Sequence, residues 1–363
     1  MEKKIVKLGI VGLKRGRYVG EIVLKDENVK ITAVADKDAE SLAACRKMYE
    51  DAGVTDVLYL DNYEDLLKAD IDAVYVCTDK PLHTKHVLMA FDAGKHVISE
   101  IPVIETEEEA KILLDAVRSH PELKYMAAEN CNYWGHIEAW KKMREDGLLG
   151  DVVYAEGEYL HAGNPEEFAH IAPSPEHWRF RNPAITYLTH ELGPLLYILD
   201  DHCVSVTCME PSIIYNPHVD RAENGIALFR TAKGAVIRIF IGFGAYVGFD
   251  HNYAVYGTRG SLITDKTAPC ESAHTFAKMA SIPGTLEKHF EIPVSADGGT
   301  GVVENHGGAD GKMMRDFIKC IIDDTEPPIT VEDGIRMSLP GIIAHKSALQ
   351  GGALLPIPDI DEL

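Results

Sequence analysis

The stretch GIVGLKRGRYVG at residues 9–20 decides the fold of the first part of this 363-residue chain. It follows a short apolar run and is expected to open a helix, with glycines at Gly9, Gly12 and Gly16. Glycine at such places lets the backbone turn sharply and approach a pyrophosphate, which rests on the helix N-terminus. The spacing G-x-x-G-x-x-x-G is looser than the usual dinucleotide fingerprint, so its context has to support it.

The next apolar run supplies that context, because VKITAVAD (29–36) ends in an acidic residue. Asp36 follows the glycine loop by roughly twenty residues, the place where a carboxylate binds the ribose hydroxyls of a dinucleotide. Since a carboxylate there disfavours a 2′-phosphate, the sequence predicts NAD in preference to NADP. The cations Lys14 and Arg15 in the loop leave NADP as an alternative.

Five short apolar runs alternate with amphipathic segments over the first 130 residues. The runs are IVKLGIVG (5–12), VKITAVAD (29–36), IDAVYVCT (71–78), KHVISE (95–100) and KYMAAE (124–129). Each run has apolar residues at both its odd and its even positions, as expected for parallel strands covered on both faces. Helical patterns lie between them, at 38–52, 81–93 and 106–119, and Thr106 with Glu109 is a capping-box signature. Residues 1–130 are therefore predicted to form a doubly wound α/β Rossmann domain.

The pattern changes after residue 130. A helix at 136–146 precedes longer, partly alternating strands at 151–161, 204–210, 224–230, 235–243 and 251–257. RTAKGA (230–235) indicates a hairpin turn with Gly234 in a positive-φ position. Helices are expected at 308–322 and 331–349, and 267–306 is expected to be a long irregular excursion. Residues 131–363 are thus predicted to be an α+β domain with a large open, mainly antiparallel sheet, whose C-terminal helices can pack back on the first domain.

Composition narrows the partners of this chain. The 36 basic and 57 acidic residues give a net charge of −21, which disfavours nucleic acid and anionic lipid as partners. No apolar run approaches the roughly 18 residues that a membrane span needs. The seven cysteines are scattered without a C-x-x-C pair, which favours reduced thiols and a cytoplasmic location.

The block AVYVCTDKPLHTKHVLMAFDAGKHVISEIP (73–102) resembles the signature of the Gfo/Idh/MocA oxidoreductase superfamily. Its members share T-x-x-x-x-H, then A-G-K-H-V, then E-K-P. The resemblance implies NAD(P) at the carboxyl edge of the parallel sheet and a sugar held against the open sheet of the second domain. Together with the glycine loop, the positions expected to bind the cofactor are Gly9, Gly12, Leu13, Lys14, Arg15, Asp36, Thr78, His83, Glu100, Ile101, Pro102 and Glu129.

Ile101 stands where sugar dehydrogenases of the superfamily have a lysine that moves a proton to and from a substrate hydroxyl. The chain is similar to the NAD-dependent α-N-acetylgalactosaminidase branch (glycoside hydrolase family 109), which also has an apolar residue there. Further blocks similar to that branch are AENCNYWG (128–135), DVVYAEGEYLHAG (151–163), EHWRFR (176–181), YLTHELGP (187–194), RTAKG (230–234) and NHGGADGKMMRDF (305–317). The chain departs from the branch at Leu188, at Glu191 and over 163–175, which concerns the identity of the sugar more than the chemistry.

The branch implies glycoside cleavage by transient oxidation. Hydride leaves carbon 3 for NAD, a base removes the proton on carbon 2, the group on carbon 1 is eliminated, water adds, and the hydride returns. Groups that transfer protons near neutral pH are needed. The motifs carry over Glu129, Tyr159, Tyr187 and His190 as catalytic candidates, and His161, Trp178, Arg179 and His306 as substrate-binding ones.

Among the catalytic candidates, His190 is assigned to proton transfer at the carbon 3 hydroxyl or the leaving group. Tyr187, three residues away on a helix start, lies beside it. Tyr159 is assigned as the base at carbon 2, which requires a lowered pKa, for which Arg179 is the candidate cation. Glu129, which ends the last parallel strand, could contact the nicotinamide ribose or the sugar.

Other functions remain open at this stage. A plain NAD(P)-dependent sugar dehydrogenase is one. A metal-dependent, NAD-independent keto-glycoside lyase is another, with Glu129, His161, His190 and His306 as alternative metal ligands. A regulator that senses dinucleotide or sugar without turnover belongs to a different class. A homo-oligomer, dimer or tetramer, is expected by analogy with superfamily relatives.

Overall fold

The computed structural model describes residues 4–161, 172, 175–245, 248–268, 274–284, 288–292 and 308–363. The chain forms two compact units, one made of 1–129 with 310–335 and the other of 130–309 with 336–363. The sequence analysis placed the domain boundary after residue 130, and that division stays a prediction. Segment 310–335 belongs to the first unit, although the sequence alone placed it after the boundary.

The first unit is built on a six-stranded parallel sheet with the order β3-β2-β1-β4-β5-β6. Its strands are β1 (Val6–Val11), β2 (Val29–Ala35), β3 (Leu58–Leu60), β4 (Ala73–Val76), β5 (His96–Ser99) and β6 (Tyr125–Ala127). Its helices are α1 (Leu13–Val23), α2 (Ala39–Asp51), α3 (Tyr63–Lys68), α4 (His83–Asp92), α5 (Glu107–Ser119) and α9 (Ala309–Asp323). After β3 the chain crosses to the other side of β1, where β4 pairs with it, so the strand order reverses as in a doubly wound fold.

Local signals in the first unit act as the sequence predicts. All four residues of β4 are buried, which fits a parallel strand covered on both faces. Thr106 accepts a hydrogen bond from the Glu109 amide, and the Glu109 carboxylate accepts one from the Thr106 amide, which completes the capping box of α5. Together with the six-stranded parallel sheet, these features confirm the predicted Rossmann fold.

The second unit contains a nine-stranded sheet with the order β14-β13-β12-β11-β7-β10-β9-β8-β15. Its strands are β7 (Val152–Leu160), β8 (Cys203–Met209), β9 (Asn224–Thr231), β10 (Val236–Gly242), β11 (Asp250–Gly257), β12 (Gly260–Thr264), β13 (Thr275–Met279), β14 (Phe290–Ile292) and β15 (Leu355–Pro356). Among the described strands of this sheet, β7 and β10 form the one parallel pair, so the predicted mainly antiparallel sheet is confirmed. The β9–β10 hairpin turns at Gly234, whose φ is +97°.

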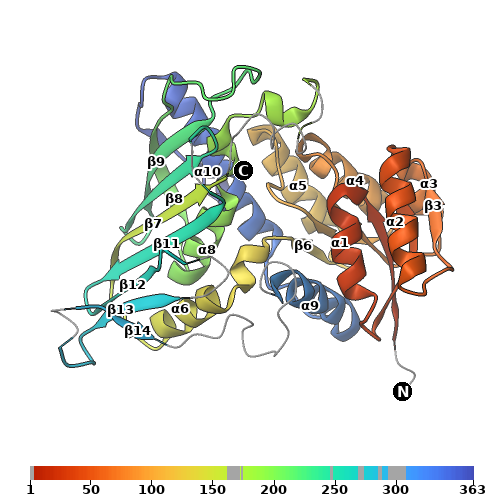
Figure 1. Ribbon diagram of the computed structural model, residues 1–363, viewed down its shortest axis with the longest axis horizontal. Coiled ribbons are helices and arrows are strands. Elements are labelled where there is room, and N and C mark those ends of the chain that lie inside the picture. Colours follow the sequence, from red (N-terminus) through yellow and green to blue (C-terminus); the bar gives the residue numbers. More distant parts are fainter. Residues whose placement is uncertain are drawn as a thin grey trace. The chain divides into compact units, whose positions relative to one another are not determined.

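Helices and short 3-10 turns accompany this sheet. They are η2 (Asn130–Tyr133), α6 (Gly135–Glu145), η3 (Trp178–Phe180), η4 (Ala184–Tyr187), α8 (Thr189–Leu199), α10 (Val331–Leu349) and η7 (Ile360–Glu362). Helix α10 is shared, because the division between the units falls after its fifth residue. Figure 1 shows α6 and α8 beside the strands, and α8 packs on β7 at Gly157, where a Cβ would lie 2.7 Å from the Glu191 Cβ. This glycine lets α8 approach the sheet closely.

One expectation for the second unit is wrong. The segment 267–306 is not irregular throughout, because β13 and β14 lie within it and extend the sheet. The sequence did not indicate these two short strands, because the residues around them are rich in Gly and Ser. It also did not indicate β12, the strand with which β13 pairs. Among the described residues, no helix is long and apolar enough to cross a membrane.

Candidate active site

The glycine loop of the first unit packs closely on the strands beside it, which only glycine permits at these positions. Gly12 has a φ of +89°, and a Cβ there would lie 2.3 Å from the backbone oxygen of Cys77. A Cβ on Gly16 would lie 2.6 Å from Ile10. No acidic residue occupies the first turn of α1, and Gly12 brings no side chain to cap it. This N-terminus therefore fits an anionic pyrophosphate.

Asp36 stands at the end of β2, beside the same loop. Its Oδ2 accepts a hydrogen bond of 2.6 Å from the Leu13 amide, and its Oδ1 accepts one of 2.9 Å from the Asp38 amide. Each carboxylate oxygen retains a second lone pair, which is how the carboxylate can also accept from ribose hydroxyls. The carboxylate is thus held where the fingerprint requires it, so the residues of this loop fit NAD.

Arg15, which left NADP open as an alternative, is held by two carboxylates. Its Nε donates to Glu100 at 3.2 Å and its Nη2 donates to Asp310 at 2.6 Å. Glu100 also accepts a short hydrogen bond from the Tyr75 hydroxyl. An arginine neutralised in this way is poorly placed to bind a 2′-phosphate, so the structure favours NAD. Asp310 joins this group from a distant part of the sequence, which no local pattern indicated.

The remaining cofactor positions of the signature block have internal partners. His83 is buried, and its two ring nitrogens lie 2.9 Å from the Pro102 oxygen and 2.8 Å from the Thr78 oxygen. The Thr78 hydroxyl lies 3.0 Å from His86 Nδ1, and Ile101 is buried. His83 thus holds together the loops that follow β4 and β5, and cofactor contact by these residues stays a prediction.

Three predicted catalytic residues gather in the second unit. Tyr159 comes from β7, Tyr187 from the end of η4 and His190 from the first turn of α8. The ring of Tyr159 lies 6.3 Å from that of Tyr187 and 5.6 Å from that of His190, and the last two are 5.6 Å apart. Tyr187 ends a 3-10 turn instead of starting the helix, yet it still reaches His190.

The sequence analysis missed a buried pair beside this group. His251, on β11, stacks on Tyr159 at 4.3 Å, and its Nδ1 lies 2.5 Å from the Glu191 Oε1. Both partners are almost fully buried. A carboxylate on Nδ1 fixes the orientation of the imidazole and its tautomer. A single histidine within a strand carries no signal, but Glu191 was visible as a departure from the resembled branch.

The assignment of Tyr159 as a base needs correction. Its pKa was expected to be lowered by Arg179. In the structure the pKa of the Tyr159 hydroxyl is raised well above its usual value, because burial and the neighbouring Tyr187 outweigh the opposite effect of Arg179. A buried phenol of this kind keeps its proton at neutral pH, so Tyr159 is suited to donate a hydrogen bond.

The predicted substrate positions lie around the same rings. The guanidinium carbon of Arg179 lies 4.5 Å from the centre of the Trp178 ring and 5.0 Å from that of Tyr187. His161 contacts Tyr159 edge-on at 5.8 Å. These three residues therefore border the catalytic candidates of the second unit. His306 lies outside the described residues, so its expected role has no structural account.

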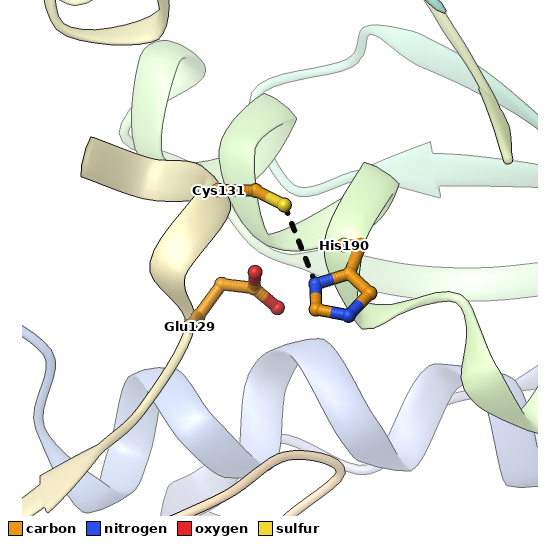
Figure 2. Close-up of side chains that lie close together, drawn as sticks. All are labelled: Glu129, Cys131 and His190. Atoms are coloured by element: carbon orange, nitrogen blue, oxygen red, sulfur yellow. Dashed lines mark hydrogen bonds between the residues drawn. The ribbon is translucent and has the colours of Figure 1, made fainter. Parts of the chain in front are cut away.

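A possible group of metal ligands differs from the one expected from the sequence. Figure 2 shows Glu129, Cys131 and His190, whose ligand atoms lie within 4.8 Å of one another. The Cys131 sulfur lies 3.4 Å from His190 Nδ1. Within the described chain His161 does not join this group, because its ring is turned toward Phe243 and Phe249. Cys131 was overlooked because a lone cysteine in a sequence does not indicate a site.

Comparison with protein families identifies both parts of the chain. The model described as "Oxidoreductase family, NAD-binding Rossmann fold" of the Gfo/Idh/MocA type matches residues 6–128. The model of the Gfo/Idh/MocA C-terminal domain matches residues 137–263.

Curated proteins and solved structures give related matches over nearly the whole chain. An α-N-acetylgalactosaminidase of Bacteroides fragilis is 29% identical, over 98% of this chain and 92% of that protein. A glycosyl hydrolase family 109 protein of Solibacter usitatus is 26% identical, over 98% of this chain and 88% of that protein. The solved structure of levoglucosan dehydrogenase with NADH and levoglucosan is 19% identical, with a TM-score of 0.83 and coverage of 98% and 100%. At that identity the last match shows a shared fold.

Proposed function

Because the chain belongs to the Gfo/Idh/MocA oxidoreductase family, we propose that it is an NAD-dependent enzyme that cleaves glycosides by transient oxidation at carbon 3 of the sugar. The group on carbon 1 leaves by elimination, water adds to the resulting double bond, and carbon 3 is reduced again. The names of the similar glycosyl hydrolase family 109 proteins support glycoside cleavage.

One observation favours glycoside cleavage over simple oxidation by a sugar dehydrogenase. The tyrosines and the histidine that the motifs single out come from three separate elements, yet their rings lie within 6.3 Å of one another. Meanwhile the position of the dehydrogenase lysine holds the buried, proton-free Ile101. Proton transfer at several carbons of one sugar ring needs more than one acid–base group. The cluster of Tyr159, Tyr187 and His190 therefore supports elimination from the sugar better than it supports a single oxidation.

The roles of these groups follow from their surroundings. In the His190 tautomer whose Nδ1–H donates to the Cys131 sulfur, the Nε2 lone pair accepts the carbon 3 hydroxyl proton during oxidation and releases it to water. The same lone pair then accepts the carbon 2 proton during elimination and returns it to the departing oxygen. Tyr159, whose pKa is raised by burial, keeps its proton and can donate a hydrogen bond to the departing oxygen. Tyr187 lies within ring contact of both and orients the substrate between them.

The first unit has the residues to hold the cofactor. Gly12 lets the loop before α1 pack closely on the backbone of Cys77, and Asp36 is placed for the ribose. NAD supplies the hydride acceptor at carbon 3 and, once reduced, the hydride donor. Ile101 is buried and has no ionisable group, so it takes no part in proton transfer.

The test uses nitrophenyl glycosides of several sugars and both anomers, with the purified full chain and added NAD. We expect release of nitrophenol without net accumulation of NADH, and exchange of the carbon 2 hydrogen with solvent deuterium. His190→Ala and Tyr187→Phe should each reduce the rate by at least about 100-fold. Near-normal rates in both variants would contradict the assignment, and steady accumulation of NADH would indicate a sugar dehydrogenase instead.

A metal-dependent keto-glycoside lyase is the second candidate, and the proximity of Glu129, Cys131 and His190 favours it. A thiolate, an imidazole and a carboxylate form a donor set that suits zinc. Activity that a chelator abolishes and that is indifferent to NAD would select this candidate. Absence of turnover with every sugar, combined with tight binding of NAD, would select a sensor.

A further inference from the structure

An ion-pair group at the carboxyl edge of the parallel sheet takes no part in the proposed reaction. Arg15, in the first turn of α1, donates from Nε to Glu100 at 3.2 Å and from Nη2 to Asp310 at 2.6 Å. Glu100 directly follows β5, and Asp310 lies in the first turn of α9. Three elements that are distant in the sequence therefore meet at one guanidinium group.

The Arg15 side chain extends across the end of β4. In the sheet, β4 lies between β1 and β5 and is parallel to both, so α1 and Glu100 lie at the same edge on either side of it. A dinucleotide crosses this edge where the strand order reverses, between β1 and β4. Asp36, after β2, is placed for the adenosine ribose. Arg15 and Glu100 are thus on the side of the other half of the cofactor, which carries the nicotinamide.

The two ion pairs leave one nitrogen of Arg15 available to a ligand. Within the described chain the Nη1 atom makes no hydrogen bond, and the side chain keeps 29% of its surface exposed. An arginine has N–H donors on all three of its side-chain nitrogens. Because the two carboxylates offset the charge of the guanidinium, its remaining donors suit a neutral oxygen, such as a ribose hydroxyl, better than a phosphate.

Asp310 differs from Arg15 because its side chain is fully buried. It is therefore not placed to contact a ligand and acts on one only through Arg15. A buried carboxylate is tolerated when it is paired and hydrogen-bonded, so this contact strongly restricts the arginine. Nε and Nη2 share one edge of the rigid guanidinium plane, and holding that edge at two carboxylates fixes the direction of Nη1.

We propose that Asp310 is a positioning residue for the cofactor. It holds the Arg15 guanidinium so that Nη1 donates to the ribose of the nicotinamide half of NAD. A donor that is oriented before the ligand arrives reduces the entropic cost of binding. The inference goes beyond the proposed function, because it concerns binding of the cofactor and is independent of which sugar reaction follows.

The experiment measures binding by isothermal titration calorimetry, so that it does not depend on turnover. The full chain is titrated with NAD and with ADP, which has the adenosine and both phosphates but lacks the second ribose and the nicotinamide. Asp310→Asn and Asp310→Ala should weaken NAD binding about 10-fold or more, the effect of losing a well-oriented hydrogen bond. ADP affinity should stay within about 2-fold of that of the unmodified chain, because Asp36 and the glycine loop are unchanged.

Controls separate this role from a general effect on the fold. Asp323→Asn, at the exposed end of the same helix, should change neither affinity. Since Asp310 acts through Arg15, Arg15→Gln should weaken NAD binding by a similar factor. The double variant Arg15→Gln with Asp310→Asn should then bind NAD no more weakly than the weaker single variant. Urea unfolding establishes that each variant is folded, and two substitutions at Asp310 are used so that one that fails to fold does not end the test.

Three outcomes would overturn the inference. Unchanged NAD affinity in the folded Asp310 variants would show that the carboxylate does not position a cofactor contact. An equal loss of NAD and ADP affinity would show that the ion pair only supports the fold of the unit. Additive losses in the double variant would show that Asp310 and Arg15 act separately. A chain that binds NAD as predicted but cleaves no glycoside would instead refute only the proposed function.

Discussion

Replacing Gly12 by alanine tests whether stability and NAD affinity depend on the close packing of the glycine loop. The new Cβ would lie 2.3 Å from the Cys77 oxygen, 2.5 Å from the Cys77 carbonyl carbon and 2.8 Å from the Thr78 nitrogen. All three are backbone atoms of the segment that leaves β4, so no side chain can rotate away. The residue would also have to keep a φ near +89°.

The two effects can be estimated separately. Placing an L side chain in the left-handed region costs about 1–2 kcal/mol. Forcing an extra carbon into a packed site costs about 1–3 kcal/mol more. Gly12→Ala should therefore lower the free energy of unfolding of the first unit by about 2–5 kcal/mol. Because the loop must shift, the affinity for NAD should fall at least about 10-fold, which corresponds to about 1.4 kcal/mol.

Gly94→Ala is the matched control, because Gly94 has a φ of +70° and open space where its Cβ would be. It should show the backbone cost alone, about 1–2 kcal/mol, with unchanged NAD affinity. Urea unfolding gives the stabilities and calorimetric titration gives the dissociation constants. If the two variants lose the same stability and bind NAD equally, the argument from close approach at Gly12 is wrong.

Two further predictions concern buried histidines of the second unit. Glu191→Gln should reduce kcat about 10–100-fold and shift the pH profile of kcat, because the carboxylate orients His251. The control Glu210→Gln alters the separate pair with His345 and should change neither. Unchanged kinetics in Glu191→Gln would exclude a catalytic role for the Glu191–His251 pair. Burial lowers the pKa of His136 to about 3. Between pH 6.5 and 3 the unfolded chain therefore binds a proton at this histidine that the folded chain does not bind. As a result, the free energy of unfolding decreases by about 1.4 kcal/mol for each pH unit by which the pH is lowered in this range. Urea unfolding of His136→Gln at pH 7 and 5.5 should show this loss reduced, whereas a loss as large as in the unmodified chain would refute the assignment.

Much of the fold follows from local patterns in the sequence. The alternation of short apolar runs with helical segments predicts the Rossmann unit, because strands buried on both faces need no information beyond their own composition. The capping box at Thr106 and the turn at Gly234 are equally local. The motif residues Tyr159, Tyr187 and His190 could be named for the same reason, since each lies within a contiguous block that resembles a family.

Tertiary structure alone decides what those residues have as neighbours. Asp310 reaches Arg15 across 295 positions of the chain, and Glu191 meets His251 across 60. Sequence spacing carries no record of such contacts, because they arise when separate elements pack. The pKa of Tyr159 shows the consequence: its direction depends on burial and on rings from other elements, so the sequence-based expectation had the wrong sign. Strand composition and turn chemistry thus determine the architecture, while long-range packing determines which side chains hold or release a proton.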